Sequence, residues 1–424
     1  MLETLKNAWR VKELRNKILY TLLIIVIFRI GSVIPVPYIN PDMIKAATGD
    51  NSFFNYLSIL TGGGLEYGAI FAMSITPYIN ASIIIQLLCV AIPYLERLSK
   101  EGEEGQKKLA TITRYTTVIL ALIQGVAYYF YLKGSSCLTV TKYYWFAAIV
   151  IVLTFAAGSA VVMWLGEQVD VKGIGNGISI LLFAGILSRG PIAFGQLWLY
   201  WKDQHQYFAV IGIILAFLAV IAFIVWMTNA ERRIPVQYAK RVVGNKMYGG
   251  QNTHIPIKVN MSGVMPVIFA SSILMLPTMI LSFMSTEKQM GTFGKFLQLF
   301  STQGVFYAVM YFLMIIAFAY FYATIQFNPV EMANNLRKNG GAIPGIRPGK
   351  PTTDFISKIL SRITLMGALF LSVIAILPII VGNVGQINIS LGGTSVLIMV
   401  GVALDTVNNL ESQMMMRHYK GFLD

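Results

Sequence analysis

The chain has 424 residues, of which 56% are hydrophobic and 12% are charged, and its mean hydropathy is +0.65. A soluble globular domain carries about 25% charged residues, so this composition excludes an ordinary soluble enzyme, a disordered protein and a collagen-like fibre. Two cysteines and three widely separated histidines exclude a disulfide scaffold and a thiolate metal cluster. The net charge of +14 raises the question of where the cations lie.

Ten segments of the chain are apolar over nearly the length that a helix needs to cross a bilayer, which is about 20 residues. In chain order they are residues 18–36, 74–92, 113–132, 144–165, 174–188, 207–229, 262–285, 304–326, 361–381 and 393–410. The fifth segment is too short to cross the membrane straight. We expect it either to continue past Arg189 and Pro191 or to end at a cavity.

The lysines and arginines are distributed unevenly between the two sides of these segments. Of the 33 Lys and Arg residues, 25 fall in the terminal segments and in alternate loops, all on one side of the membrane. The positive-inside rule places this side in the cytoplasm. We therefore expect both termini to be cytoplasmic, as an even number of spans requires.

Two parts of the chain repeat at a spacing of five spans. Residues 77–84 (PYINASII) in span two match residues 266–273 (PVIFASSI) in span seven at five of eight positions, and residues 177–182 in span five resemble residues 393–398 in span ten. An odd number of spans per repeat predicts two halves in inverted orientation. The alternative is chance resemblance between apolar helices that are rich in small residues.

The two matched helices that carry prolines are candidates for a moving seam. Pro77 in span two and Pro266 in span seven are each expected to remove a backbone hydrogen bond within the helix. The small residues beside them, such as Ala81 and Ala270, allow neighbouring helices to approach closely.

The sequence lacks the motifs of common enzymes. It contains no Walker loop, dinucleotide fingerprint or His-Glu-x-x-His motif, and the glycine spacing of residues 345–349 does not fit a phosphate loop. We therefore expect a non-enzyme without cofactor or metal. The predicted spans contain two charged residues, Arg29 and Asp405, which we interpret as helix anchors or bridges because a proton relay needs more members.

Two basic loops on the predicted cytoplasmic side are too long to be simple connectors. In residues 230–260 the alternation of Ile234, Val236 and Tyr238 predicts a small hairpin. Its tip would carry three cations, Lys240, Arg241 and Lys246. In residues 327–362 a helix over Val330–Lys338 is followed by a stiff turn, rich in proline and glycine, that displays Arg347. Such cations serve topology control or contact with anionic lipids, or they form a docking platform for an acidic partner or for RNA phosphates.

The chain resembles the SecY family of protein-conducting channels over essentially its whole length. The stretches that carry the resemblance are residues 28–32 (FRIGS), 34–37 (IPVP), 77–88, 164–168 (WLGEQ), 173–180 (GIGNGISI), 238–241 (YAKR), 258–261 (KVNM), 269–272 (FASS), 327–329 (FNP) and 344–349 (PGIRPG). Their order along the chain makes the match specific, although no single stretch is specific alone.

The resemblance implies an all-α membrane protein with ten transmembrane helices in two inverted five-helix halves around an hourglass pore, with a short plug helix. The halves would be residues 1–203, with spans one to five, and residues 204–424, with spans six to ten and the two cytoplasmic loops. The implied pore ring consists of Ile75, Ile79, Ile178, Leu182, Ile268 and Ile398. The internal repeat independently pairs Ile79 with Ile268 and Leu182 with Ile398.

The plug implied by the resemblance lies at about residues 61–72. Its residues are Gly62, Gly63, Gly64, Leu65, Glu66, Tyr67, Gly68, Ala69, Ile70 and Phe71. The glycines are typical of a mobile segment with few packing contacts. The alternative is an ordinary re-entrant turn.

The function implied is a passive channel in the bacterial cytoplasmic membrane. It would translocate unfolded secretory chains and release apolar segments sideways into lipid. Polar candidates along this lateral gate are Asn80, Gln86 and Thr117. The implied partners are the subunits SecE and SecG, the SecA ATPase, the ribosome with its RNA phosphates, signal peptides and nascent chains, and anionic lipids. SecA or the ribosome would dock at Lys240, Arg241, Lys246 and Arg347 and supply the driving force.

Two other functions fit part of the pattern. A small-solute secondary transporter also uses inverted repeats and broken spans, but the missing intramembrane carboxylates and the bulky basic loops argue against it. A scaffold or insertase without a pore predicts that Ile79→Asn and Ile268→Asn leave ion leakage unchanged, whereas a channel predicts leakier membranes.

Overall fold

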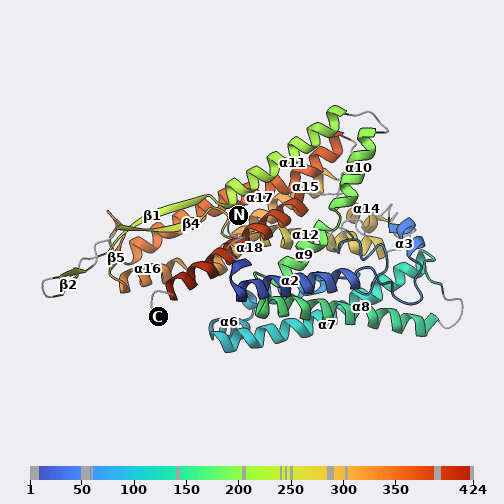
Figure 1. Ribbon diagram of the computed structural model, residues 1–424, viewed down its shortest axis with the longest axis horizontal. Coiled ribbons are helices and arrows are strands. Elements are labelled where there is room, and N and C mark those ends of the chain that lie inside the picture. Colours follow the sequence, from blue (N-terminus) through green and yellow to red (C-terminus); the bar gives the residue numbers. More distant parts are fainter. Residues whose placement is uncertain are drawn as a thin grey trace.

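The computed structural model shows an elongated helical bundle with a β extension at one end (Figure 1). It describes residues 9–48, 58, 61–139, 144–202, 207–238, 241–243, 246–248, 252–283, 291–300, 304–385 and 393–420.

Each of the ten predicted spans contains a helix. These helices are α2 (Lys12–Gly31), α5 (Thr76–Ala91), α7 (Glu103–Gly134), α8 (Tyr144–Lys172), α9 (Gly177–Leu187) with α10 (Gly190–Lys202), α11 (Tyr207–Thr228), α12 (Met265–Phe283), α15 (Val305–Gln326), α17 (Lys350–Gly385) and α18 (Gly393–Lys420). Among the residues that the structure describes there are four shorter helices, α3 (Pro41–Thr48), α6 (Pro93–Lys100), α14 (Thr292–Gln298) and α16 (Pro329–Lys338).

Within the described ranges, 6 helices are long and apolar enough to cross a membrane, or 7 if the pair α5 and α6, bent by 103°, counts as one span. The chain is therefore a multi-pass membrane protein. Crossing by all ten predicted spans stays a prediction.

The fifth span continues past its break, which confirms one of the two expectations. Helices α9 and α10 together form a candidate span over Gly177–Lys202. At the break, Ser188 donates a hydrogen bond to the carbonyl of Gly185 at 2.6 Å. Pro191 lies in the first turn of α10, where its missing N–H costs no helical hydrogen bond. The break thus places Arg189 between two helices rather than at the end of a span.

The five-span repeat recurs in helix packing. Helix α5 packs on α7 as α12 packs on α15, α7 packs on α8 as α15 packs on α17, and α8 packs on α9 as α17 packs on α18. The expected role of the matched prolines is wrong. Pro77 and Pro266 are the second residues of α5 and α12, so neither removes a helical hydrogen bond. The proline inside a matched helix is Pro277 in α12.

The predicted hairpin is present and extends from the helical bundle. Strands β1 (Glu231–Tyr238) and β4 (Asn252–Lys258) pair antiparallel, and β5 (Gly341–Ala342) adds a third strand in the order β4-β1-β5. Ile234 and Val236 point into an apolar cluster with residues of α16 and α17, among them Leu336 and Ile356. The fold therefore contains a small antiparallel sheet in addition to the helices of the predicted all-α class. This sheet packs on the second basic loop.

The hairpin continues outward in the short strands β2 (Arg241–Val243) and β3 (Lys246–Tyr248). Two of the predicted docking residues, Arg241 and Lys246, begin these strands. Lys240 lies outside the described residues.

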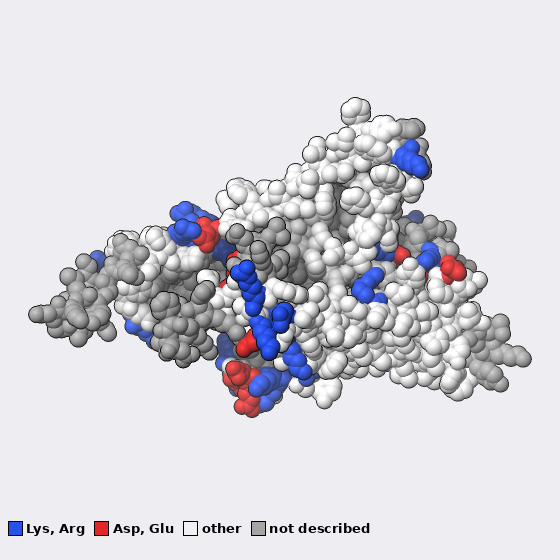
Figure 2. Space-filling view, viewed as in Figure 1, with Lys and Arg blue, Asp and Glu red and all other residues white. Residues whose placement is uncertain are grey.

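Charged side chains gather toward the two ends of the bundle in Figure 2, and an uncharged surface lies between them. The larger group of charges lies toward the end with the sheet and α6, and a smaller group lies toward the end with α3 and α10 (Figures 1 and 2). On this face, an uncharged zone between two charged ends is the surface that a bilayer requires (Figure 2).

Candidate functional site

The six residues of the predicted pore ring lie in one apolar cluster. Ile75, Leu182 and Ile398 are buried members of this cluster, and Ile79, Ile178 and Ile268 pack against it half-buried. Ile75 directly precedes α5, and the other five come from four helices that are far apart in sequence, α5, α9, α12 and α18. The fold therefore brings all six together between the two halves of the repeat.

Local capping presents two of these residues on α9. Asn176 caps this helix by accepting a hydrogen bond from the N–H of Ser179 at 3.0 Å, and Asp170 accepts one from the N–H of Gly177 at 2.7 Å. These two bonds satisfy N–H groups that the first turn leaves free. The start of α9 is thereby fixed, and Ile178 and Leu182 follow in its first two turns.

Residues 61–75, which we call the external segment, form consecutive turns that run into α5. The expectation of a plug helix at residues 61–72 is wrong for this stretch. Its backbone pairs with the chain after α2, where Val36 N–H donates to the carbonyl of Gly68 at 2.9 Å and Ile70 N–H donates to that of Ile34 at 3.0 Å. From α7, the hydroxyl of Tyr128 donates to the carbonyl of Leu65 at 3.1 Å.

The expectation that this segment makes few packing contacts is also wrong. Leu65, Ala69 and Phe71 are buried, and Phe71 belongs to the same apolar cluster as the ring. A side chain at Gly158 of α8 would collide with the carbonyl of Ile70, so this glycine allows the segment to approach the helix. The segment therefore packs firmly against the cluster that contains the ring.

Two arginines hold the polar side of the external segment. Arg29 of α2 donates to the carbonyl of Gly62 at 3.1 Å and to the hydroxyl of Ser188 at 2.8 Å. Arg189 forms an ion pair with Glu66. The interpretation of Arg29 as a residue that bridges helices is confirmed, because its guanidinium joins α2, the external segment and the end of α9.

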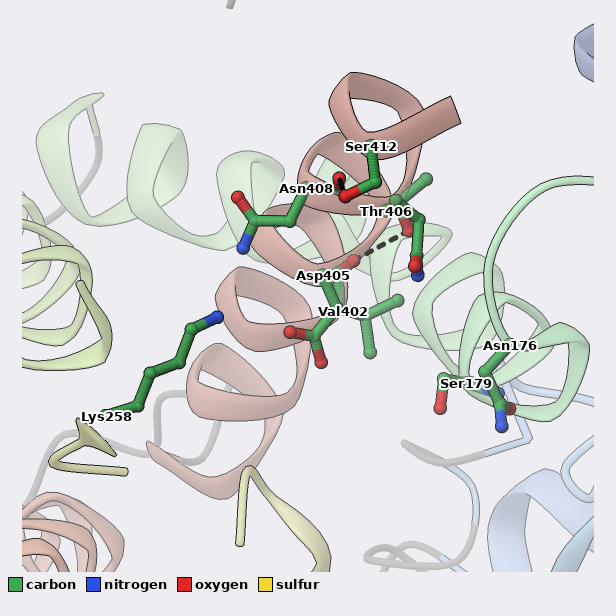
Figure 3. A pocket seen from close by; sticks show the side chains of 9 residues that line it. Asn176, Ser179, Lys258, Val402, Asp405, Thr406, Asn408 and Ser412 are labelled. Carbon is green, nitrogen blue, oxygen red and sulfur yellow. Dashed lines mark hydrogen bonds between the residues drawn. The ribbon is translucent and has the colours of Figure 1, made fainter. Parts of the chain in front are cut away.

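A polar cavity of about 340 Å³ adjoins the other side of the ring (Figure 3). It is lined by Asn176, Ser179, Lys258, Val402, Asp405, Thr406, Asn408, Asn409 and Ser412. Val402 also belongs to the cluster that contains the ring. In Figure 3 the Lys258 side chain extends toward Asp405, and the residues of α9 face those of α18 across the cavity. Asp405, which we expected to anchor helices, thus faces a polar space.

Comparison with known proteins identifies the family of this arrangement. The family model for SecY matches residues 69–407. The protein translocase subunit SecY of Bacillus subtilis is 45% identical over 436 residues, with 100% of each chain covered. The chain belongs to the SecY family. As a SecY-family member it is a subunit of a translocase and is not itself an enzyme.

Solved channels of this family share the fold. A SecY structure, described as one whose plug domain stabilizes the closed state and maintains a membrane seal, has a TM-score of 0.63 at 19% identity and covers 94% of this chain and 92% of its own. Sec61 in the canine ribosome-channel complex from the endoplasmic reticulum has a TM-score of 0.62 at 18% identity with the same coverage. At these identities the likeness concerns the fold.

The predicted lateral-gate residues of this SecY-family chain make hydrogen bonds within single helices. Gln86 donates to the hydroxyl of Ser82 at 3.3 Å on α5, and Thr117 donates to the carbonyl of Thr113 at 2.7 Å on α7. Asn80 lies half-buried on α5. These bonds of Gln86 and Thr117 therefore do not join the two halves.

The seam beside these residues is apolar. Ile83 of α5 lies in one buried cluster with Val267, Ala270 and Leu274 of α12. Helix α12 also packs on α7. Aliphatic contacts lack fixed directions, so these side chains do not specify a single relative position of the two helices.

The second basic loop presents Arg347 as predicted. It lies exposed in the turn between β5 and α17, where its carbonyl accepts a hydrogen bond from Thr352 at 2.9 Å. The neighbouring glycines, Gly345 and Gly349, have positive φ values of 80° and 108°. Because L side chains rarely adopt these conformations, the glycines define the turn that displays this arginine.

Sequence reasoning missed the contacts of Arg189. The sequence marked this residue only as a possible break in span five. A buried arginine beside an acid is a recognisable signal in a structure, but its partner Glu66 lies 123 residues away in the chain.

Proposed function

We propose that this chain is a passive channel that conducts unfolded secretory polypeptides across the bacterial cytoplasmic membrane and releases apolar segments sideways into lipid. The observation that carries the proposal is the convergence of six aliphatic ring residues from both halves of the repeat in one cluster. The protein translocase subunits to which the chain is similar support the same function.

An aliphatic ring suits a channel that accepts many sequences. Its walls offer ions no groups to replace their hydration, so a closed ring acts as a dewetting barrier. They also offer no hydrogen bonds to a particular side chain, so the ring does not select a sequence. Volume is the property that it senses, and Ile and Leu side chains fit around a chain by rotamer changes.

The sideways release of apolar segments follows from transfer energies. Leu, Ile, Phe and Val each favour the bilayer centre by about 0.3 to 0.6 kcal/mol on insertion scales. A segment of about 20 such residues therefore prefers lipid to the channel. The proposed exit lies between α5 with α7 on one side and α12 with α15 on the other, along the apolar seam of Ile83 and Leu274.

The driving force would come from partners on the side with the sheet, which we propose is cytoplasmic. Arg347 and the hairpin residues Arg241 and Lys246 offer cations for the SecA ATPase or for ribosomal RNA phosphates. A channel of the same fold is found in a ribosome-channel complex. We propose SecE and SecG as membrane partners and anionic lipids as contacts of the remaining basic residues.

A crosslinking experiment tests the function. A secretory chain is arrested during translocation, and single cysteines are placed at Ile79, Ile178 and Ile268 in a background without Cys89 and Cys137. We expect disulfide or bifunctional crosslinks between each ring cysteine and the arrested chain. The matched control is Leu215→Cys on α11, whose side chain is 61% exposed on the outer surface.

Equal crosslinking at the control and ring positions, or none at the ring, would contradict a central path. Saturable uptake of a small solute into vesicles that contain the purified protein, together with absent crosslinks, would instead favour a secondary transporter.

A further inference from the structure

Three side chains meet at the polar side of the external segment. Arg189 donates to the hydroxyl of Ser58 and to the carboxylate of Glu66, and Ser58 donates to the same carboxylate at 2.7 Å. The Ser58 hydroxyl thus accepts from the arginine and donates to the acid. The three groups form a closed triangle that joins the break between α9 and α10 to the external segment.

Two groups of this triangle are buried and the third is partly exposed. The Arg189 side chain is 7% exposed and that of Glu66 is 28% exposed, and Ser58 is fully buried. The Nε atom of Arg189 is buried without a hydrogen-bond partner. A buried guanidinium with an unsatisfied N–H gains solvation when its surroundings open, so the closed arrangement is not the best environment for this cation.

We propose that Arg189 and Glu66 form a latch that holds the external segment over the ring in the closed channel, and that a translocating chain opens the channel by separating this pair. The inference rests on the proposed function and adds the residues that control opening. Ser58 orients the carboxylate within the latch.

The energetics of buried ion pairs fit a latch of this kind. Desolvation offsets much of the attraction between two buried charges, so an intact pair holds the segment only modestly. Removal of Glu66 leaves the Arg189 charge buried and alone, which is far less favourable, and removal of Arg189 leaves a partly exposed carboxylate without its cation. Loss of either Arg189 or Glu66 should therefore favour the open channel, because there the remaining charge reaches water.

Arg29 provides a second and independent contact. Its guanidinium binds the backbone carbonyl of Gly62 and the hydroxyl of Ser188, and neither partner carries a charge. Changes at Glu66 leave the groups of this contact unaltered. The segment should therefore remain folded near its site when the latch is broken, so that leakage reports on opening rather than on unfolding.

The test uses the full chain with its co-purified membrane subunits in vesicles. Two readouts are measured on each variant, anion leak without substrate and ATPase-driven uptake of a secretory precursor. The variants are Arg189→Gln, Glu66→Gln and the charge exchange Glu66→Arg with Arg189→Glu. Glu66→Gln is the mildest, since it keeps the size of the side chain and removes its charge. Lys295→Gln on α14 removes a cation from the same end of the bundle and serves as the matched control.

We expect each single latch variant to raise the leak roughly tenfold, which is the factor for a modest shift in the population of the open state. The charge exchange should return the leak to within about twofold of the unchanged protein because the pair is restored, and Lys295→Gln should leave it unaltered. Leak is normalised to the amount of inserted protein, so poor insertion of one variant does not mimic a closed channel.

The two proposals fail in different ways. If the unchanged complex takes up precursor, but the single variants leak no more than it does, the latch is wrong. The latch is also wrong if the charge exchange leaks as much as the single variants. If the unchanged complex shows no precursor uptake, the proposed function fails instead.

Discussion

In the proposed channel, the ring and the external segment close the same path by different kinds of contact. The ring consists of aliphatic side chains alone, whereas the external segment is held by backbone hydrogen bonds, a partly buried ion pair and the guanidinium of Arg29. Directional contacts specify one partner, and apolar contacts accept many shapes. The external segment always meets the same residues of its own chain, while the proposed substrates of the ring differ from one another.

This difference predicts which substitutions each region tolerates. The ring should accept changes of shape and reject changes of polarity. The external segment should respond to small changes of geometry, because the loss of one directional contact leaves a buried group unsatisfied.

The largest expected effect lies outside both regions. Arg347→Glu reverses an exposed charge in the proposed docking loop, far in sequence from the ring and the external segment. We expect precursor export to be lost while the protein remains inserted and the anion leak stays at its original value, because docking and sealing use different residues. Export and leak are measured on the same vesicles, with Lys350→Glu in the same loop as a comparison. Normal export by Arg347→Glu would refute the docking role.

A strong effect is expected from making the ring polar. The double variant Ile79→Asn with Ile268→Asn places two amides in the aliphatic cluster, where they hold water and remove the dewetting barrier. We expect an anion leak at least about tenfold above that of the unchanged protein, measured by chloride efflux from vesicles. The matched control is Ile84→Asn on α5, a residue that is 39% exposed and lies outside the ring cluster. An unchanged leak in the double variant would favour a scaffold without a pore.

A moderate effect on the leak distinguishes a change of side-chain shape in the ring from the loss of a directional contact in the external segment. Leu182→Ile in the ring conserves volume, so precursor uptake and leak should both stay within about twofold. Arg189→Lys keeps the charge of the external contact but loses the planar guanidinium that reaches Ser58 and Glu66 together. We expect its leak to rise about threefold to fivefold, less than that of Arg189→Gln. A larger leak from Leu182→Ile than from Arg189→Lys would contradict the proposed difference between the ring and the external segment.

The smallest expected effect is a reduced rate of maleimide labelling at Cys137. This thiol is buried in a cluster that contains Leu65 of the external segment, and burial raises the pKa of Cys137 above its ordinary value. Because the thiolate is the reactive form, maleimide labelling should be slow at neutral pH, and its rise with pH should come later than for an exposed cysteine. The measurement is a rate series from pH 7 to pH 9 in a Cys89→Ser background. Labelling as fast as that of a cysteine placed at the exposed Ser136 would show that the site is open.

Much of the fold could be predicted from local patterns. Hydrophobic stretches of helical length predicted a helix in each of the ten spans, and the alternation of Ile234, Val236 and Tyr238 predicted the hairpin. The repeat between residues 77–84 and 266–273 predicted equivalent helices, which now begin at matched positions and pack on matched neighbours. Length, periodicity and internal similarity are properties of neighbouring residues, so they are visible without coordinates.

Long-range packing decided what the local patterns left open. The matched prolines lie at helix starts, the external segment is a packed series of turns, and span five continues through its break. Whether a proline interrupts a helix depends on where the helix begins, and the packing of a glycine-rich stretch depends on the surfaces that surround it.

The sequence by itself determined the membrane class, the helices, the five-span repeat and the aliphatic nature of the ring candidates. Only the tertiary structure decided that Arg189 lies against Ser58 and Glu66, which are 131 and 123 residues away in the chain. A pairing of this kind leaves no periodic trace, because each residue alone looks like an ordinary charged or polar side chain. It exists because the break after α9 and the turns before α5 are brought to the same buried place, where an isolated charge would be strongly unfavourable.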